Sequence, residues 1–116
     1  MIIAALETQL SEPRLKSEIR VSAILRRAQA AGAFAVVARR GDVDAGAIAV
    51  KVYIGAGRGR LHVEARDEQG RAIWREPLGG ESEECAIDGY LDKERRFDSD
   101  LWIVEIEDRE GRPFLD

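Results

Sequence analysis

Two runs of alternating apolar residues flank one charged octet, RRGDVDAG at residues 39–46, and this arrangement restricts the fold more than any other part of the chain. In AFAVVARR and AIAVKVYI, apolar residues recur at every second position, which is the period of a half-buried β-strand. Glycine and aspartate between them favour a turn, because glycine adopts positive φ and aspartate binds nearby backbone amides. The pattern predicts one extended ribbon from Phe34 to Ile54 that doubles back as a hairpin at Gly41–Gly46.

Three further strands and two helices follow from the same kind of pattern. The strands are RLHVEAR, RAIWREPL and LWIVEIED; the last is apolar on both faces, so we expect it inside the sheet. SEIRVSAILRRAQAAG and SEECAIDGYLDKERRF carry apolar stripes at helical spacing, with Ser17 and Ser82 placed as N-caps. We predict an α+β fold: a mostly antiparallel sheet of four to five strands with two helices packed on one face.

The length of 116 residues suits a single domain. Pro13 interrupts any helix that continues from Leu10, so residues 1–13 are interpreted as an N-terminal extension and residues 14–116 as one α+β domain. The opening MIIAALETQL has no basic region and its apolar run is short, which is untypical of a signal peptide or a membrane span. The expected location is the cytoplasm, with no membrane partner.

The charge balance argues against a nucleic-acid binder. The formal net charge is −4, whereas such proteins usually present a strongly basic face. Arg26 and Arg27, near the end of the first predicted helix, are explained by the helix dipole.

Cysteine and histidine usage gives no catalytic pair. Cys85 is the single cysteine, so it forms no internal disulfide, and His62 is the single histidine. They lie in different predicted elements, whereas a nucleophilic cysteine usually has a histidine partner. His62 falls on the polar face of its strand, where we expect it to be exposed. We predict no catalytic residue and no cofactor on these grounds.

Two segments share an Arg-Arg pair followed closely by two aspartates, RRGDVDAG and RRFDSDLW. Such loops can pair reciprocally, the arginines of one with the aspartates of the other, within one chain or between two copies. This layout favours a binding or assembly module that uses charged surface loops, with a second copy or another protein as its partner. The candidate binding residues are Arg39, Arg40, Asp42, Asp44, Arg95, Arg96, Asp98 and Asp100.

The alternative is a metal-dependent hydrolase or phosphodiesterase. Asp42 and Asp44 lie in one turn, and Glu105 and Glu107 lie at the end of the last strand. Clustered carboxylate oxygens suit Mg²⁺ or Ca²⁺, and such ions activate water for hydrolysis. This hypothesis requires the turn and the strand end to meet, and the sequence does not give the strand order. It leaves open whether the protein is an enzyme.

The chain also resembles a family of small bacterial proteins, mainly from alphaproteobacteria, catalogued as a domain of unknown function. The resemblance covers about residues 14–116 and is carried by RLKSEI, GAFAVVARRGDVDAGAI and RRFDSDLWIVEIEDREGRPFLD. Two positions depart from the pattern: the family favours an aromatic near Arg20 and a proline where Ser99 stands. The resemblance implies a cytoplasmic α+β domain and brings no assigned activity, cofactor or site residue.

Overall fold

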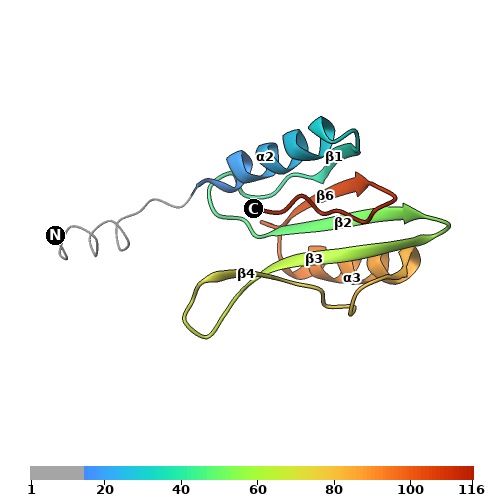
Figure 1. Ribbon diagram of the computed structural model, residues 1–116. Coiled ribbons are helices and arrows are strands. Elements are labelled where there is room, and N and C mark those ends of the chain that lie inside the picture. Colours follow the sequence, from blue (N-terminus) through green and yellow to red (C-terminus); the bar gives the residue numbers. More distant parts are fainter. Residues whose placement is uncertain (1–14) are drawn as a thin grey trace.

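The computed structural model describes residues 15–116, so the expected extension of residues 1–13 lies outside the described part of the chain. Within these described residues there are two helices and a six-stranded sheet, which confirms the α+β class (Figure 1). Neither helix is long and apolar enough to cross a membrane. In chain order the elements are α2 (Ser17–Ala30), β1 (Phe34–Arg39), β2 (Ile48–Gly55), β3 (Arg58–Arg66), β4 (Ala72–Arg75), β5 (Ser82–Glu83), α3 (Glu84–Phe97) and β6 (Trp102–Glu107).

The strand order is β1-β6-β2-β3-β4, with the two-residue β5 paired to β3. Strand β6 runs antiparallel to β1, placing Ala35 opposite Ile106, and parallel to β2, placing Val50 opposite Val104. The other strand pairs are antiparallel. The last strand in sequence therefore lies inside the sheet, as its two apolar faces predicted.

The predicted hairpin between residues 34 and 54 is wrong. Both arms are strands, but β6 separates β1 from β2, and the ribbon does not pair with itself. The reason is that β6 is apolar on both faces: Leu101 and Ile103 on one, Trp102 and Val104 on the other. A central position buries both faces, whereas a hairpin of β1 with β2 would leave β6 at an edge.

The prediction that both helices cover one face is also wrong. Figure 1 shows α3 behind the sheet, while the segment that follows β6 crosses in front of the sheet. Successive residues of β2 and β6 point to opposite faces, both faces are apolar, and each receives one helix. The core packed by α2 contains Val21, Ile24, Ala28, Ala35, Ile48, Val50, Val52, Trp102, Val104 and Ile106. The core packed by α3 contains Ala49, Leu61, Val63, Ile87, Leu91, Leu101 and Ile103.

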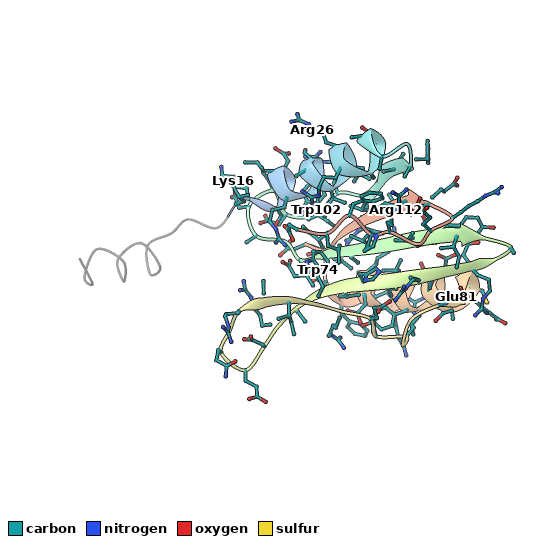
Figure 2. The ribbon with its side chains drawn as sticks, viewed as in Figure 1. Lys16, Arg26, Trp74, Glu81, Trp102 and Arg112 are labelled. Atoms are coloured by element: carbon teal, nitrogen blue, oxygen red, sulfur yellow. The ribbon has the colours of Figure 1, made fainter. Side chains whose placement is uncertain are left out.

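The side of α2 that faces the sheet is apolar, and its opposite side is charged. Trp102 is 1 % exposed and lies between α2 and the sheet, whereas Arg26 projects from α2 into solvent (Figure 2). The opposite sides of α2 thus follow the spacing predicted for an amphipathic helix.

Residues 41–46 form a wide connection that caps α2. The backbone amides of Ser17 and Glu18 donate to the carbonyls of Asp44 (3.2 Å) and Val43 (3.1 Å), and the Ser17 hydroxyl donates to the Gly46 carbonyl at 2.6 Å. These bonds satisfy amides that a helix N-terminus leaves without internal partners. Lys16, rather than Ser17, is the N-cap residue, because the Ser17 side chain is turned to this connection.

Ser82 is likewise not an N-cap. It lies in β5, and its hydroxyl donates to the carbonyls of Leu78 and Gly80. The first amide of α3, that of Glu84, instead donates to the Gly57 carbonyl at 2.8 Å. Both helices therefore begin against loops that follow other strands, which sequence spacing did not reveal.

Two glycines allow the 41–46 connection to approach the chain that enters β6. A Cβ at Gly41 or at Gly46 would overlap the Asp100 carbonyl oxygen. Gly89, in the middle of α3, is the opposite case, because nothing lies within 4 Å of a Cβ there.

Replacing Gly46 by alanine is expected to reduce the free energy of unfolding by about 1–3 kcal/mol, the usual cost of overpacking. The matched control Gly89→Ala is expected to raise it by up to about 1 kcal/mol, because alanine favours a helix interior. Urea denaturation of both variants measures the difference. Equal stability of the Gly46→Ala variant and the unmodified protein would contradict the close contact.

Candidate functional site

The two Arg-Arg-containing segments lie against each other. The Asp42 amide donates to the Asp100 carbonyl at 3.0 Å, and the Trp102 indole Nε1 donates to the Asp42 carbonyl at 2.7 Å. The Trp102 amide donates to the Ala47 carbonyl at 2.8 Å. Backbone groups of one segment thus hold backbone and indole groups of the other.

The side chains of the segments do not form the reciprocal Arg–Asp pairs. Arg39 donates to the carbonyls of Asp98 (3.0 Å), Ser99 (3.2 Å) and Leu101 (2.9 Å), which follow the end of α3. Arg40 binds Glu18 at 2.9 Å, and its guanidinium lies 5.1 Å from the ring centroid of Trp102. The arginines of the first segment therefore stabilise a turn and a helix start.

The aspartates act mainly within their own turns. Asp42 Oδ2 accepts from the amides of Asp44 (3.2 Å) and Ala45 (2.9 Å), and Asp98 Oδ1 accepts from the Asp100 amide at 2.9 Å. Asp44 lies 3.5 Å from Lys16 Nζ in an exposed pair. This is the turn chemistry expected of aspartate.

The structure does not bring the acidic turn and the end of β6 together. Asp42 lies beside Asp100 and Trp102, at the start of β6. Glu105 and Glu107 follow three and five residues beyond Trp102, at about 3.3 Å per residue. Within residues 15–116 no group of three or more His, Cys, Asp or Glu side chains is arranged to hold a metal ion. The geometry thus gives no support to a shared metal site.

A groove runs between α3 and the β1–β6 side of the sheet. It consists of three adjoining hollows of about 370, 350 and 130 Å³ that share lining residues. One end is basic, and the other end is acidic. We call it the α3–β1 groove. Its basic end is Arg39, Arg95 and Arg96, with Asp92 beside Arg95, and its acidic end is Glu84, Glu105 and Glu107. Phe34, Val36, Leu91 and Ile103 supply apolar surface.

Lys51 lies between the two ends of this groove. Its side chain is only 6 % exposed, and its Nζ lies 2.7 Å from Asp88, 2.8 Å from Glu84 and 3.5 Å from Glu105. Burial lowers the pKa of Lys51, but hydrogen bonds to Asp88 and Glu84 outweigh burial and raise it above the ordinary value. Lys51 is therefore a fixed charge. Its signal in the sequence is a lone lysine within the apolar strand AIAVKVYI.

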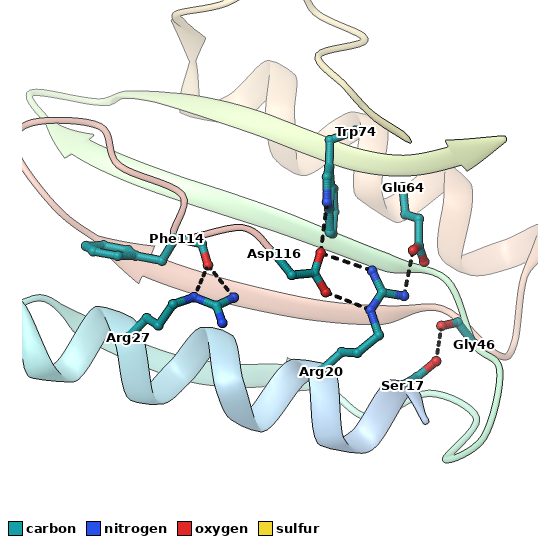
Figure 3. A network of polar contacts seen from close by, with 8 residues as sticks. All are labelled: Ser17, Arg20, Arg27, Gly46, Glu64, Trp74, Phe114 and Asp116. Atoms are coloured by element: carbon teal, nitrogen blue, oxygen red, sulfur yellow. Dashed lines mark hydrogen bonds and ion pairs between the residues drawn. The ribbon is translucent and has the colours of Figure 1, made fainter. Parts of the chain in front are cut away.

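A second polar cluster lies on the other face, beneath the C-terminal segment, residues 108–116 (Figure 3). Arg20 contacts Asp116 at 2.8 Å and Glu64 at 2.6 Å, and the Trp74 indole donates to Asp116 at 3.2 Å. The Arg20 hydrogen bond lowers the pKa of Asp116. Arg27 donates twice to the Phe114 carbonyl, at 2.7 and 2.9 Å. These contacts fasten the segment to α2, through Arg20 and Arg27, and to the sheet, through Trp74.

His62 is buried on this same face, contrary to the expectation that it is exposed. The residue is 8 % exposed, its Nε2 has no hydrogen-bond partner among the described residues, and Glu76 Oε1 is 3.9 Å away. Burial lowers the pKa of His62, an effect that Glu76 partly opposes. The folded protein therefore favours the neutral ring.

Protonation of His62 should destabilise the fold in mildly acidic solution. The unfolded chain binds this proton more tightly, so the free energy of unfolding falls as the pH drops below the ordinary histidine value of 6.5, by at most about 1.4 kcal/mol per pH unit. Denaturation between pH 8 and pH 5 should show this slope, and His62→Gln should flatten it. An equal slope in both proteins would contradict the assignment. Asp108 and Asp116, whose pKa values are lowered, titrate at lower pH and outside this range.

Comparison with known proteins agrees with this fold. The crystal structure of a DUF1491 family protein from Caulobacter crescentus is similar, with a TM-score of 0.80 and 46 % identity over 88 % of this chain and 95 % of that chain. The solution structure of a protein from A. tumefaciens gives 0.75 and 42 %, over 88 % and 92 %. No curated protein matches.

The family model described as "Protein of unknown function (DUF1491)" matches residues 15–116. This match confirms the resemblance to a family found in alphaproteobacteria, and it covers every residue that the structure describes. On the strength of the sequence match and the shared fold, the chain belongs to the DUF1491 family.

Proposed function

We propose that the protein is a protein-interaction module that binds an extended segment of a partner protein along β1 and the adjoining α3–β1 groove. The observation that carries the proposal is that β1 is an exposed edge strand. This strand ends the sheet order, and its Phe34 is 60 % exposed. Strand edges of soluble proteins are usually shielded, because their free amides and carbonyls pair with other chains.

The backbone of β1 is nearly free on its outer side. Within residues 15–116 no strand pairs with that side. Gln29 Nε2 reaches the Ala35 carbonyl at 3.5 Å, a long contact at the limit of hydrogen bonding. An incoming strand can replace such a contact, as happens when a peptide adds a strand to an exposed sheet edge.

The side chains beside β1 supply specificity. Phe34 and Val36 present apolar surface along the groove, while the groove ends have opposite charge. A complementary ligand is a strand with alternating apolar residues, a basic residue near the Phe34 end and an acidic residue near the Arg39 end. In this proposal the charged segments contribute through Arg39, Arg95 and Arg96, with the remaining candidate residues holding their loops in place.

A reducing compartment fits this role. Cys85 is a free, exposed thiol, and thiols of this kind persist in the cytoplasm, which is the proposed site of action.

A display library of eight-residue peptides tests the proposed function. Selection on the full chain should enrich peptides with alternating apolar residues and charges of opposite sign at their two ends. Phe34→Ala should weaken the binding of these peptides at least tenfold, because the substitution removes apolar surface at the edge of the sheet. Phe97→Ala is the matched control, since Phe97 is 85 % exposed at the end of α3 and lies outside the groove lining. Absence of enrichment, or equal loss in both variants, would overturn the proposal.

A further inference from the structure

We infer that the strand bound at β1 is β1 of a second copy of this chain, so that two sheets join about a two-fold axis. This inference rests on the proposed function and names the partner of the same edge. Strand β1 supplies the apolar residues and the basic end of the complementary strand, with apolar residues from Phe34 to Ala38 followed by Arg39 and Arg40, and the acidic groups are those of Glu105 and Glu107 on the neighbouring β6. Two-fold symmetry pairs the two strands antiparallel, which is the usual form of a self-complementary contact.

The backbone gives the register. The Ala35 carbonyl meets Gln29 of α2 and therefore faces away from β6. Because alternate residues of a strand direct their backbone groups to the same side, Val37 also faces outward. Pairing Ala35 of each copy with the partner's Val37 puts Val36 on the two-fold axis and Phe34 opposite the partner's Ala38.

The side chains fit this register. Val36, which is 36 % exposed, meets its own copy at the axis, where directly opposed side chains of an antiparallel pair come closest. The large Phe34, 60 % exposed, meets the small and exposed Ala38. The contact therefore covers the exposed apolar side chains of β1 with one another.

The charges fit as well. A two-fold axis perpendicular to the sheet reverses one groove relative to the other. The acidic end of each groove, with Glu105 and Glu107, then lies beside the basic end of the partner's groove, with Arg39 and Arg95. Local complementarity of this kind favours one orientation of the two copies.

The predicted dimer is weak. A bulge between Val37 and Arg39 ends the regular part of β1, so the paired stretch is short. Stable interfaces bury about 1,000 Å² or more. A five-residue strand contact, from Phe34 to Ala38, lies near the lower limit together with its flanking side chains, so association should depend on concentration in the micromolar range.

Sedimentation of the full chain between about 1 and 500 µM tests the inference. The unmodified protein should pass from monomer to dimer. Val36→Lys and Val36→Glu should each weaken association at least tenfold, because like charges meet at the axis, and an equimolar mixture of the two variants should associate again. Ile73→Lys on β4, the opposite edge, is the matched control: Ile73 is 39 % exposed, and its substitution should leave the dimer intact.

A disulfide gives a second readout that does not need a destabilising charge. In a Cys85→Ala background, Val36→Cys should oxidise to a covalent dimer, because the Cα atoms of a non-hydrogen-bonded antiparallel pair lie about 4.5 Å apart, within the range of about 4.4–6.8 Å that disulfides span. Ile73→Cys in the same background should not.

Three outcomes overturn the inference. The chain is monomeric throughout the concentration range; or it associates equally with Val36→Lys in place; or it associates only after residues 1–13 are removed, which would assign the edge to that segment. A monomer that still binds the selected peptides at β1 leaves the proposed function standing and overturns only the second copy as partner. Absence of both activities overturns both.

Discussion

The contact of the 41–46 connection with Asp100 and Trp102 fixes the rest of the fold. The Asp42 amide, the Asp42 carbonyl and two glycines all meet the chain where it enters β6. The same connection gives its carbonyls to the first amides of α2. One short loop therefore positions the central strand and a helix together, and a single shift there would move both.

The local elements were predictable because their signals are local. Alternation identified β1, β2, β3 and β6, and helical spacing identified α2 and α3 within a few residues of their bounds. The central place of β6 also followed from sequence, since Leu101 to Val104 are apolar without alternation. Which strand pairs with which is a non-local property, and turn-forming residues at 41–46 fit a wide loop as well as a hairpin.

The contacts of the candidate site residues were less predictable than the local elements. The sequence suggested that the two Arg-Arg segments could pair within one chain or between two copies, but it did not reveal their contacts, because the donors of arginine bind backbone carbonyls as well as carboxylates. Arg39 takes three carbonyls after α3, and the aspartates bind amides of their own turns. The α3–β1 groove, with Lys51 in it, exists because α3 covers only part of the sheet face on which it packs. No single segment of the sequence encodes that coverage.

The insertion of β6 between β1 and β2 has a consequence for synthesis of the chain. Residues that pair in the finished sheet, such as Val50 and Val104, are more than fifty positions apart, and contacts of such separation slow folding. On the ribosome, β1 and β2 emerge long before the strand that separates them. The sheet can close only after residue 107 has left the exit tunnel, so the position of β6 between β1 and β2 stays unfilled until then.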